Sequence, residues 1–377
     1  MTLPSSGPIS LGDIGNEFGR NHPIIGNSTG NEVSLGNYRK IGTNQSNYPQ
    51  NIGDLSFASI DAISGGSVPT GTAEIKASHF RGTRLQQVVN FHGSGRGGTR
   101  LNARNRYDAG GSNDVDVVGG FRTRPSNSSN TRVYIHVNQQ IASENNNVNH
   151  VALRTGSWNP STTLSVDVGP SGRIQGSGGR GGNGSSGNGD GGPAGNGSSG
   201  LGIEYSETAV NVESGGVIAA GYGGGGGGSG GEQTDKAGTR TSGGGGGGGG
   251  AGLPPGAGGS AGANGGRTDK FQEAPNAGDP GSSSGGTFGS GTAGNPGTGG
   301  NNDNETVGAT GGEGGQHGNT PDAGGSGDGN AGPAGLDGDA IRRTNNNIVV
   351  DINGSDAGRI LGSGSNTGNN AISTGVA

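Results

Sequence analysis

Residue patterns that support catalysis or metal binding are weak in this sequence. Gly-x-Ser-x-Gly, the turn that presents a nucleophilic serine in many hydrolases, occurs at 26–30, 227–231 and 258–262. With 94 glycines in 377 residues such matches arise by chance, and none follows a strand pattern and opens a helix, as that turn requires. The six histidines show no paired metal-ligand spacing, and no Gly-x-x-x-x-Gly-Lys phosphate loop is present. We therefore expect no catalytic residue, no metal site and no cofactor.

Side chains suited to contacting another molecule lie in polar inserts that interrupt a glycine-rich region. The inserts span 232–242, 267–279, 301–309 and 313–322. Cationic and aromatic side chains there have no apolar core to serve, and loops on a rigid scaffold are frequent binding sites. The candidate receptor-binding residues are Lys236, Arg240, Lys270 and Phe271 in these inserts, and Phe288, which follows the second insert in the glycine-rich region. The alternative interpretation is that the inserts are only solvated connections.

These inserts interrupt a segment that no ordinary hydrophobic core can order. Residues 171–340 contain 65 of the 94 glycines but only ten valines, isoleucines and leucines. Burial of so few apolar side chains cannot offset the backbone entropy lost on folding. Extended glycine helices with three residues per turn offer another route, because without Cβ atoms they can pack closely and bond sideways as polyglycine II. The run 243–250 excludes a collagen register, and a flexible coil is the alternative.

A threefold internal repeat favours the ordered alternative. Each copy has an apolar-x-apolar pair, a spacer with glycine, and Gly-x-Ile. The pairs are Val166 and Val168, Val210 and Val212, and Val350 and Ile352, with a spacer two residues longer in the third copy. This alternation predicts short strands, and a coil has no need of recurring apolar pairs. The glycine tracts are expected to project from a shared apolar base. The predicted scaffold anchors are Ile174, Val212, Ile218, Ile352 and Ile360.

Residues 85–165 contain short runs rich in valine and threonine, divided by clusters of asparagine, glycine and serine. Regular short runs of this kind predict a β-sandwich or jelly-roll module. Trp158, the only tryptophan, is expected to pack this module against the first glycine tract. Stacking on a sugar ring is the alternative interpretation of its side chain.

The first 84 residues contain two versions of one unit. The versions begin at 7–10 and 71–75, and each ends in an aromatic-basic step, Tyr38-Arg39 and Phe80-Arg81. Ser10 with Asp13 predicts the capped start of a short helix, whose apolar face would hold Leu11, Ile14 and Phe18. Ser78 is expected to cap a second helix. Either a docking module or a small packed domain without a partner fits this pattern.

Together these patterns resemble the glycine-rich receptor-recognising adhesins at the tips of T-even-type bacteriophage long tail fibres. The resemblance covers about 150–362 and rests on 151–179, the Gly-Pro-Ala-Gly…Ile…Val-x-Val…Gly-x-Ile unit and the glycine runs. Residues 3–19, 33–40 and 68–83 are similar to the amino-terminal segment of many phage tail and fibre proteins. The resemblance implies a polyglycine-II sandwich whose variable loops contact the bacterial surface. Because the loops do not align, no binding residue is carried over.

We therefore expect a mainly β and irregular protein of three parts. Residues 1–84 form a virion-attachment module, 85–170 a β-sandwich-like module, and 171–377 a polyglycine-II receptor-binding head. The expected function is that of a bacteriophage tail or fibre-tip protein that binds a host receptor, either a glycan or an outer-membrane protein. The alternative is a structural tail or capsid decoration protein with the glycine region as a spacer. A depolymerase would need a carboxylate pair in a groove, and the sequence shows no such signature.

Composition narrows the partners and the compartment. The chain has no cysteine, no basic-plus-apolar leader at residues 1–30 and no apolar run near 18 residues. Its formal net charge is −6 with dispersed basic residues, whereas nucleic-acid-binding proteins are usually basic with clustered Lys and Arg. We expect synthesis in the bacterial cytoplasm, assembly into a virion, and contact with other tail or fibre proteins through residues 1–84. Nucleic-acid binding and membrane insertion are not expected, and homo-oligomerisation is left open.

Overall fold

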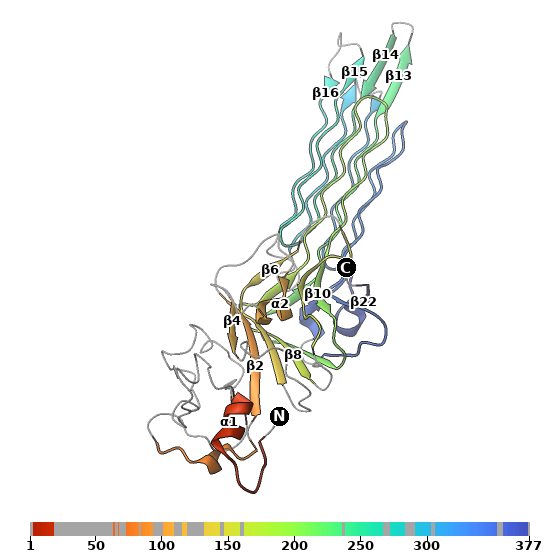
Figure 1. The fold of residues 1–377 in the computed structure, drawn as a ribbon. Helices are drawn as coiled ribbons and strands as arrows, with labels where there is room; N and C mark the ends of the chain where they lie inside the picture. The colour runs from red at the N-terminus through yellow and green to blue at the C-terminus, as the bar shows by residue number, and fades with distance from the viewer. Residues whose placement is uncertain are drawn as a thin grey trace.

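The chain is mainly β and irregular, as the sequence predicts, in the residues that the structure describes. The computed structural model describes 3–18, 63–64, 67, 73–82, 84–92, 101–108, 115–118, 132–143, 147–158, 162–235, 238–266, 272–282, 291–302, 306–352 and 357–375. Helices in these residues are short: α1 (Leu11–Phe18), α2 (Ala103–Asp108), η3 (Ala77–Phe80), η5 (Ala357–Arg359) and η6 (Gly368–Ala371). Figure 1 shows an elongated molecule in which extended tracts project from a base of strands, with α1 at the end opposite the tip. No helix of the described part is long and apolar enough to cross a membrane.

The base is built from three successive stretches of chain, and each stretch supplies one strand to each of three sheets. The first stretch supplies β7 (Val151–Arg154), β8 (Thr163–Val168) and β9 (Arg173–Gln175). The second supplies β10 (Ser199–Ile203), β11 (Thr208–Val212) and β12 (Val217–Ala219), and the third β19 (Ile341–Arg343), β20 (Val350–Ile352) and β21 (Ile360–Leu361). Equivalent strands pair in parallel, so the three copies stack on one another.

Further strands extend each sheet of the base. The order of the largest sheet is β1 (Ile63–Ser64), β2 (Arg84–Phe91), β5 (Arg132–Val137), β8, β11 and β20, with β4 (Val115–Val118) also paired to β2. The second sheet runs β22 (Ile372–Thr374), β19, β10, β7 and β3 (Leu101–Asn102), and the third runs β21, β12, β9 and β6 (Gln140–Ala142). Strands predicted to form a sandwich-like module over 85–170 thus pair with strands beyond 170. Valine-rich runs specify strands, but they do not specify which strands become neighbours.

The sequence repeat corresponds to this stacking, with one shift of register. Val210 pairs with Val166 on one side and with Ile352 on the other, where the sequence pattern had aligned Val350. Ile218 pairs with Ile174 and with Ile360. With Ile352 in that register, the strand-to-Gly-x-Ile spacing is the same in all three copies. β20 is therefore shifted by two residues relative to the alignment that the sequence pattern gives, and this shift accounts for the longer spacer of the third copy.

The apolar pairs of the repeat fill the interior of the base. Of the five predicted anchors, Ile174, Val212, Ile218 and Ile360 are buried in the main core. Ile352 is partly buried against the same core. Trp158 lies there too, 5% exposed, with its Nε1–H donating to the Thr155 carbonyl and the Arg104 guanidinium over its ring. The sugar-stacking alternative for Trp158 is therefore wrong, because both its ring and its donor are occupied by the protein.

The glycine tracts contain no helix and no named strand, and they bond sideways at every third residue. The tracts lie within 176–198, 220–230, 243–264, 274–282, 291–300 and 308–340. The N–H groups of Gly178, Gly181, Gly184 and Gly187 donate to the carbonyls of Pro254, Ala257, Ser260 and Ala263 at 2.8–2.9 Å. One residue further on, the N–H groups of Gly179, Gly182 and Ser185 donate to Tyr222, Gly225 and Gly228. Each tract thus bonds to different neighbours in turn, with a period of three.

Close approach explains why glycine fills the central tracts. A Cβ built on Gly247 would lie 1.9 Å from the carbonyl oxygen of Gly225, and one on Gly246 would lie 2.1 Å from that of Gly259. Residues 221–230 and 243–250 are buried throughout. At the outer tracts, side chains such as Arg180, Asn183 and Ser186 recur at every third position and are exposed.

The amino-terminal segment places the start of the first sequence unit against the end of the second. Ser10 and Asp13 form the predicted reciprocal cap of α1, with the Asp13 N–H donating to Ser10 Oγ at 3.0 Å and the Ser10 N–H to Asp13 Oδ2 at 2.8 Å. Ile14 is buried but Leu11 is 46% exposed, so the predicted apolar face is only partly covered. The Gly82 N–H donates to the Pro4 carbonyl, and Arg81 donates to that of Gly7.

The prediction that Ser78 caps a second helix is wrong. Ser78 lies inside η3, and the residue before this helix is Lys76, whose N–H donates to His79 Nδ1 at 3.2 Å. His79 is the third residue of this helix counted from Ala77, and its imidazole accepts the backbone N–H of the residue before the helix, a role that Glu or Gln fills in a capping box. Tyr38-Arg39 and the face of Phe18 lie outside the described residues and side chains.

Candidate contact surface at the tip of the glycine tracts

The chain reverses at the tip through two small antiparallel sheets. The first contains β13 (Gly231–Asp235), β14 (Gly238–Ser242) and β15 (Gly265–Gly266), and the second β16 (Gln272–Glu273), β17 (Asn301–Asn302) and β18 (Thr306–Val307). All of these strands except β15 come from three of the predicted polar inserts, and β15 directly precedes the second of them. Figure 1 shows β13 to β16 together at the end of the molecule farthest from α1. The inserts therefore meet on one surface although they are far apart in sequence.

The β13–β14 hairpin is fixed to its neighbours by polar side chains. Thr234 Oγ1 and Thr239 Oγ1 lie 3.0 Å apart across the two strands. Asp328 accepts the Glu232 backbone N–H, and Asn188 donates from Nδ2 to the Glu232 carboxylate. Asn188 and Asp328 belong to turns between other tracts, so three reversals of the chain are held together. A hairpin positioned in this way needs little ordering when it meets a partner.

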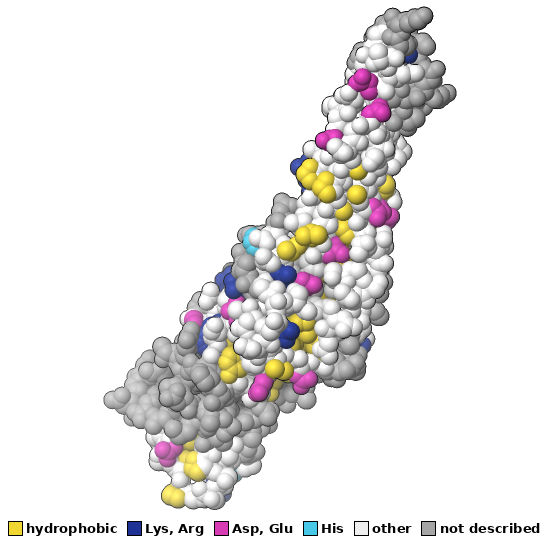
Figure 2. Space-filling view, turned by 90° about the vertical axis from the view of Figure 1, so that its right-hand side faces the viewer, with side chains coloured by type: hydrophobic (Ala, Val, Ile, Leu, Met, Phe, Trp, Pro, Cys, Tyr) yellow, Lys and Arg dark blue, Asp and Glu magenta, His cyan; other side chains and the backbone are white. Residues whose placement is uncertain are grey.

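Exposed acidic and hydroxyl groups, rather than cations, characterise the described part of the tip. Glu232, Thr234 and Thr239 are exposed, as are Asp190 and Asp328 in the adjacent turns. Figure 2 shows acidic side chains spaced along the visible face of the projecting part. The residues predicted from the sequence were the cations and aromatic residues of the glycine-rich region, and these exposed acidic and hydroxyl residues were not among them. The Thr-x-x-x-x-Thr spacing around the reversal is the signal that could have identified them as a facing pair.

Of the five candidate receptor-binding residues, Arg240 alone belongs to the part of the chain that the structure describes. Arg240 is only 3% exposed, on the central strand between Gln233 and Gly266. Lys236, Lys270, Phe271 and Phe288 lie outside the described residues. In the sequence Lys236 directly follows β13, and 267–271 stand between β15 and β16, so the described strands that flank these two stretches lie at the tip.

The described residues on either side of Phe288 lie at the opposite end of the tracts. Its flanks, Ser282 and Thr292, bond to one another at 2.8 Å, and the Gly252 N–H donates to the Ser282 carbonyl. The next residue, Leu253, donates to the carbonyl of Gly176, which directly follows β9 in the base. The structure thus brings Arg240 and the flanks of Lys236, Lys270 and Phe271 together at the tip, and it separates the flanks of Phe288 from them.

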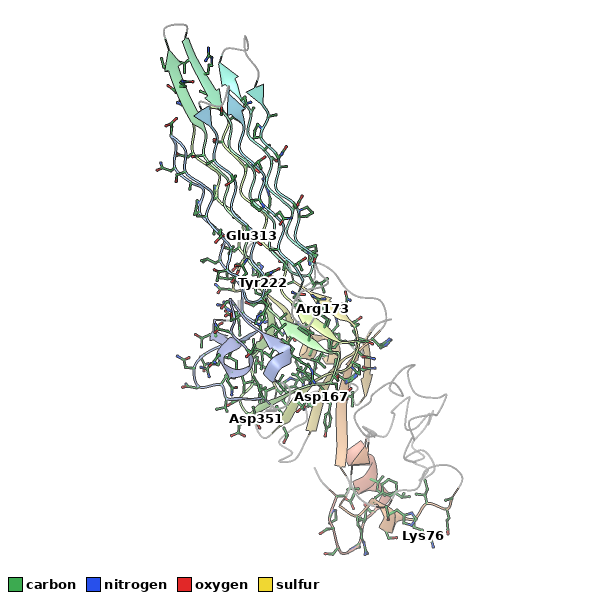
Figure 3. All side chains as sticks on the ribbon, turned by 180° about the vertical axis from the view of Figure 1, so that it is seen from behind. Lys76, Asp167, Arg173, Tyr222, Glu313 and Asp351 are labelled. Atoms are coloured by element: carbon green, nitrogen blue, oxygen red, sulfur yellow. The ribbon has the colours of Figure 1, made fainter. Side chains whose placement is uncertain are left out.

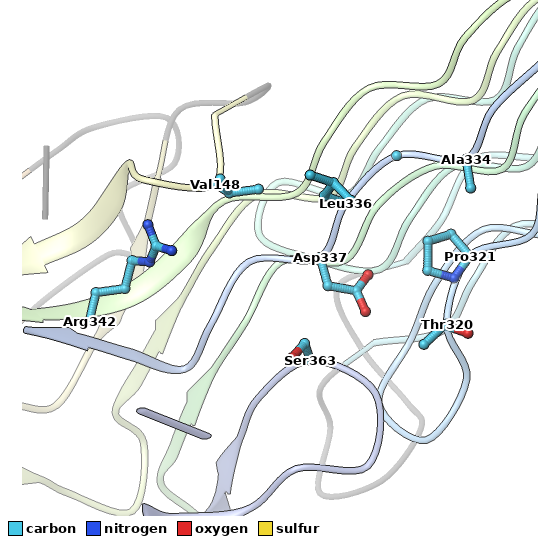
Figure 4. A pocket seen from close by; sticks show the side chains of 9 residues that line it. Val148, Thr320, Pro321, Ala334, Leu336, Asp337, Arg342 and Ser363 are labelled. Carbon is cyan, nitrogen blue, oxygen red and sulfur yellow. The ribbon is translucent and has the colours of Figure 1, made fainter. Parts of the chain in front are cut away.

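A pocket of ≈ 530 Å³ lies where the tracts join the base (Figure 4). It is lined by Val148, Thr320, Pro321, Ala334, Gly335, Leu336, Asp337, Arg342 and Ser363. Its two charged side chains already bind the protein. Asp337 accepts the Gly223 N–H at 2.9 Å and the Gly364 N–H at 3.4 Å. Arg342 donates to Asp339, Ser373 and the Gly375 carbonyl.

These contacts indicate that the pocket is a structural junction. Figure 3 shows Tyr222 between the base and the tracts, where its buried hydroxyl donates to the Gly362 carbonyl at 3.3 Å. Burial raises the pKa of Asp337 to about 6, despite the two N–H donors, and it also raises the pKa of Tyr222. The same burial favours the neutral phenol and the neutral acid. Among the described residues no group of histidine, aspartate and glutamate is placed to hold a metal ion.

Comparison with known proteins identifies a family. The family described as phage tail fibre adhesin Gp38 matches residues 112–365. Among solved structures the chain is similar to a chain in the crystal structure of the gp37–gp38 adhesin tip complex of the bacteriophage S16 long tail fibre. The identity is 16% and the TM-score 0.33, with 74% of this chain and 82% of that chain covered. No curated protein matched the sequence.

Proposed function

Because this chain belongs to the phage tail fibre adhesin Gp38 family, we propose that its tip binds a receptor on the host bacterial surface. The supporting observation is that separate polar inserts of the sequence converge on one exposed surface, at the end of the molecule away from α1. Surface loops on a rigid scaffold are where binding residues concentrate. The described tip offers carboxylates and hydroxyls, which suit the hydrogen-bonding groups of either a surface glycan or the loops of an outer-membrane protein.

We propose that the scaffold is a polyglycine-II lattice. The three-residue period of the lateral bonds fits an extended helix with three residues per turn. Close contacts between glycine backbones fit helices that touch without Cβ atoms. On this proposal the glycine tracts serve to present the tip, and the protein acts by binding rather than by catalysis.

We propose that three consecutive parts of the chain have different roles. Residues 1–84 attach the protein to another fibre or tail protein, 85–170 contribute strands to the base, and 171–377 contribute the remaining base strands and the glycine tracts that carry the receptor-binding tip. The contacts of Arg81 with Gly7 and of Gly82 with Pro4 support a folded amino-terminal unit. The protein would then be made in the host cytoplasm and be incorporated into the virion tail.

The test is competition for adsorption to host cells. Purified protein is expected to block adsorption of the phage to its host and to have no effect on a host that lacks the receptor. A triple variant, Lys236→Ser with Lys270→Ser and Phe271→Ser, is expected to compete poorly while keeping its melting temperature. Arg240 is left unchanged because it is buried. Its substitution could destabilise the fold, and a loss of competition would then not report on binding alone.

Arg180→Ser is the matched control, because it removes an exposed cation from the flank of an outer tract instead of the tip. This variant is expected to compete like the wild type. Full competition by the triple variant across the host range would exclude the side chains of Lys236, Lys270 and Phe271 as the contact site. A wild-type protein that neither binds cells nor competes would favour the alternative, a structural protein with a glycine-rich spacer.

A further inference from the structure

We propose that the glycine tracts have a mechanical function: they transmit tensile force along the long axis between the tip and the base. The setting, a tip bound to a cell and a base bound to a virion, rests on the proposed function. The mechanical property itself follows from the chain path and the hydrogen bonds, and it can be measured without a receptor.

The chain path connects the tip directly to the base. Residues 220–230 run from β12, in the base, to β13, in the tip hairpin. After β14, residues 243–251 return along the same axis to the bend at 252–254. A force applied to the hairpin is therefore delivered along two adjacent tracts, one of which continues covalently into a base strand.

The hydrogen bonds of these tracts resist sliding in a concerted way. Consecutive residues of the rising tract donate in three directions: Gly225 to Gly248, Gly226 to Asp322, and Gly227 to Gly192. All three bonds run sideways to neighbouring tracts. An axial pull loads every such bond of a tract together, whereas a sideways pull opens them one after another. Each bond contributes only about 1 kcal/mol net, so the direction of loading decides the force at which the tracts separate.

The returning tract has the same arrangement and lies at the centre. Gly247 donates to Gly182, Gly248 to Gly312, and Gly249 to Asp279. Because 243–250 are buried and their neighbours leave no room for a Cβ, this tract cannot move sideways to relieve a load. It can leave only by sliding along its own axis.

The base continues the same geometry. β12 pairs in parallel with β9 and β21, so tension passing from residue 220 into β12 also shears its ladders. Tyr222 and the Gly223 N–H add bonds to Gly362 and Asp337 at the transition. The path from hairpin to base strand thus contains no segment in which the described bonds would open singly under an axial pull.

Single-molecule force spectroscopy tests the proposal, and the absence of native cysteine makes site-specific attachment simple. The axial pair is Thr239→Cys at the tip with Asp351→Cys on β20, both exposed. The transverse pair is Ser260→Cys with Ser326→Cys, exposed on outer tracts that are joined through the tracts between them. The axial pair is expected to rupture at a several-fold higher force than the transverse pair.

Substitutions in the central tract provide a second readout. Gly247→Ala in the axial-pair protein is expected to lower the rupture force, because its Cβ would displace the neighbouring carbonyl. Gly189→Ala is the matched control, since its Cβ would meet nothing closer than 3.6 Å. Equal axial and transverse forces, or stepwise lengthening of the axial pair at low force, would overturn the proposal. Either result leaves the adsorption test unaffected, because no receptor is present.

Discussion

At the scale of single residues, Asp337 links protonation to the junction between tracts and base. Its pKa is about 6 in the folded protein against an ordinary value of 3.8, mainly because of burial, with Asp339 adding to the rise. The folded state therefore binds more protons than the unfolded state between about pH 4 and pH 6. Stability from this group is present at low pH and is lost as the pH rises through about 6.

The prediction concerns the difference between wild type and Asp337→Asn. Asparagine can still accept the Gly223 N–H but does not titrate. Between pH 4 and pH 7 the wild type is expected to lose up to about 3 kcal/mol of unfolding free energy relative to the variant. Urea unfolding at a series of pH values measures this. Parallel pH profiles of the two proteins would show that Asp337 does not titrate in this window.

A valine side chain in place of a glycine hydrogen is expected to disrupt the central tract, 243–250. Gly246→Val would place its Cβ 2.1 Å from the Gly259 carbonyl oxygen, and overpacking of this kind costs about 1–3 kcal/mol or more. Gly189→Val, in an open turn, is the control and is expected to have a far smaller effect. Thermal unfolding monitored by circular dichroism compares the two. Similar melting temperatures would contradict close packing of the tracts.

At the scale of elements, the tract 243–250 should behave as a protected unit even though it has no helix or strand. Every N–H from Gly244 to Gly250 donates to another tract. Amide exchange of this tract is therefore expected to be orders of magnitude slower than in an unstructured glycine-rich peptide. Mass spectrometry of the peptide that contains the tract measures the rate. Exchange at the rate of the free peptide would contradict the lattice proposal.

At the scale of the whole molecule, attachment and recognition should be separable. A chain that starts at Arg84, the first residue of β2, keeps every strand of the base except the two-residue β1. It is expected to adsorb to host cells but to be missing from purified virions, because residues 1–84 are proposed to dock the protein. Immunoblotting of particles and a cell-binding assay test both halves. Normal incorporation of the shortened protein would refute this assignment.

Local sequence determined those features whose physical cause is local. The cap of α1 depends on Ser10 and Asp13, three residues apart, and could be read directly. The repeated apolar pairs identified strands that do stack, because alternation and recurrence reflect burial on one face. Glycine content likewise showed that tracts such as 243–250 have no apolar side chains to bury, but composition did not reveal that Ile174, Val212 and Ile218, also within 171–340, join the hydrophobic core of the base.

Tertiary structure decided what those local features could not. Glycines are identical to one another, so nothing in 243–250 encodes that Gly247 bonds to Gly182 rather than to another tract. Arg240 looked like an exposed cation among turn residues, but pairing with β13 and β15 buries it. Ile352, rather than Val350, lies beside Val210 because all strands of the third stretch must pair with those of the second in the stacked base. In each case the deciding contact joins residues distant in sequence, and such contacts leave no local pattern.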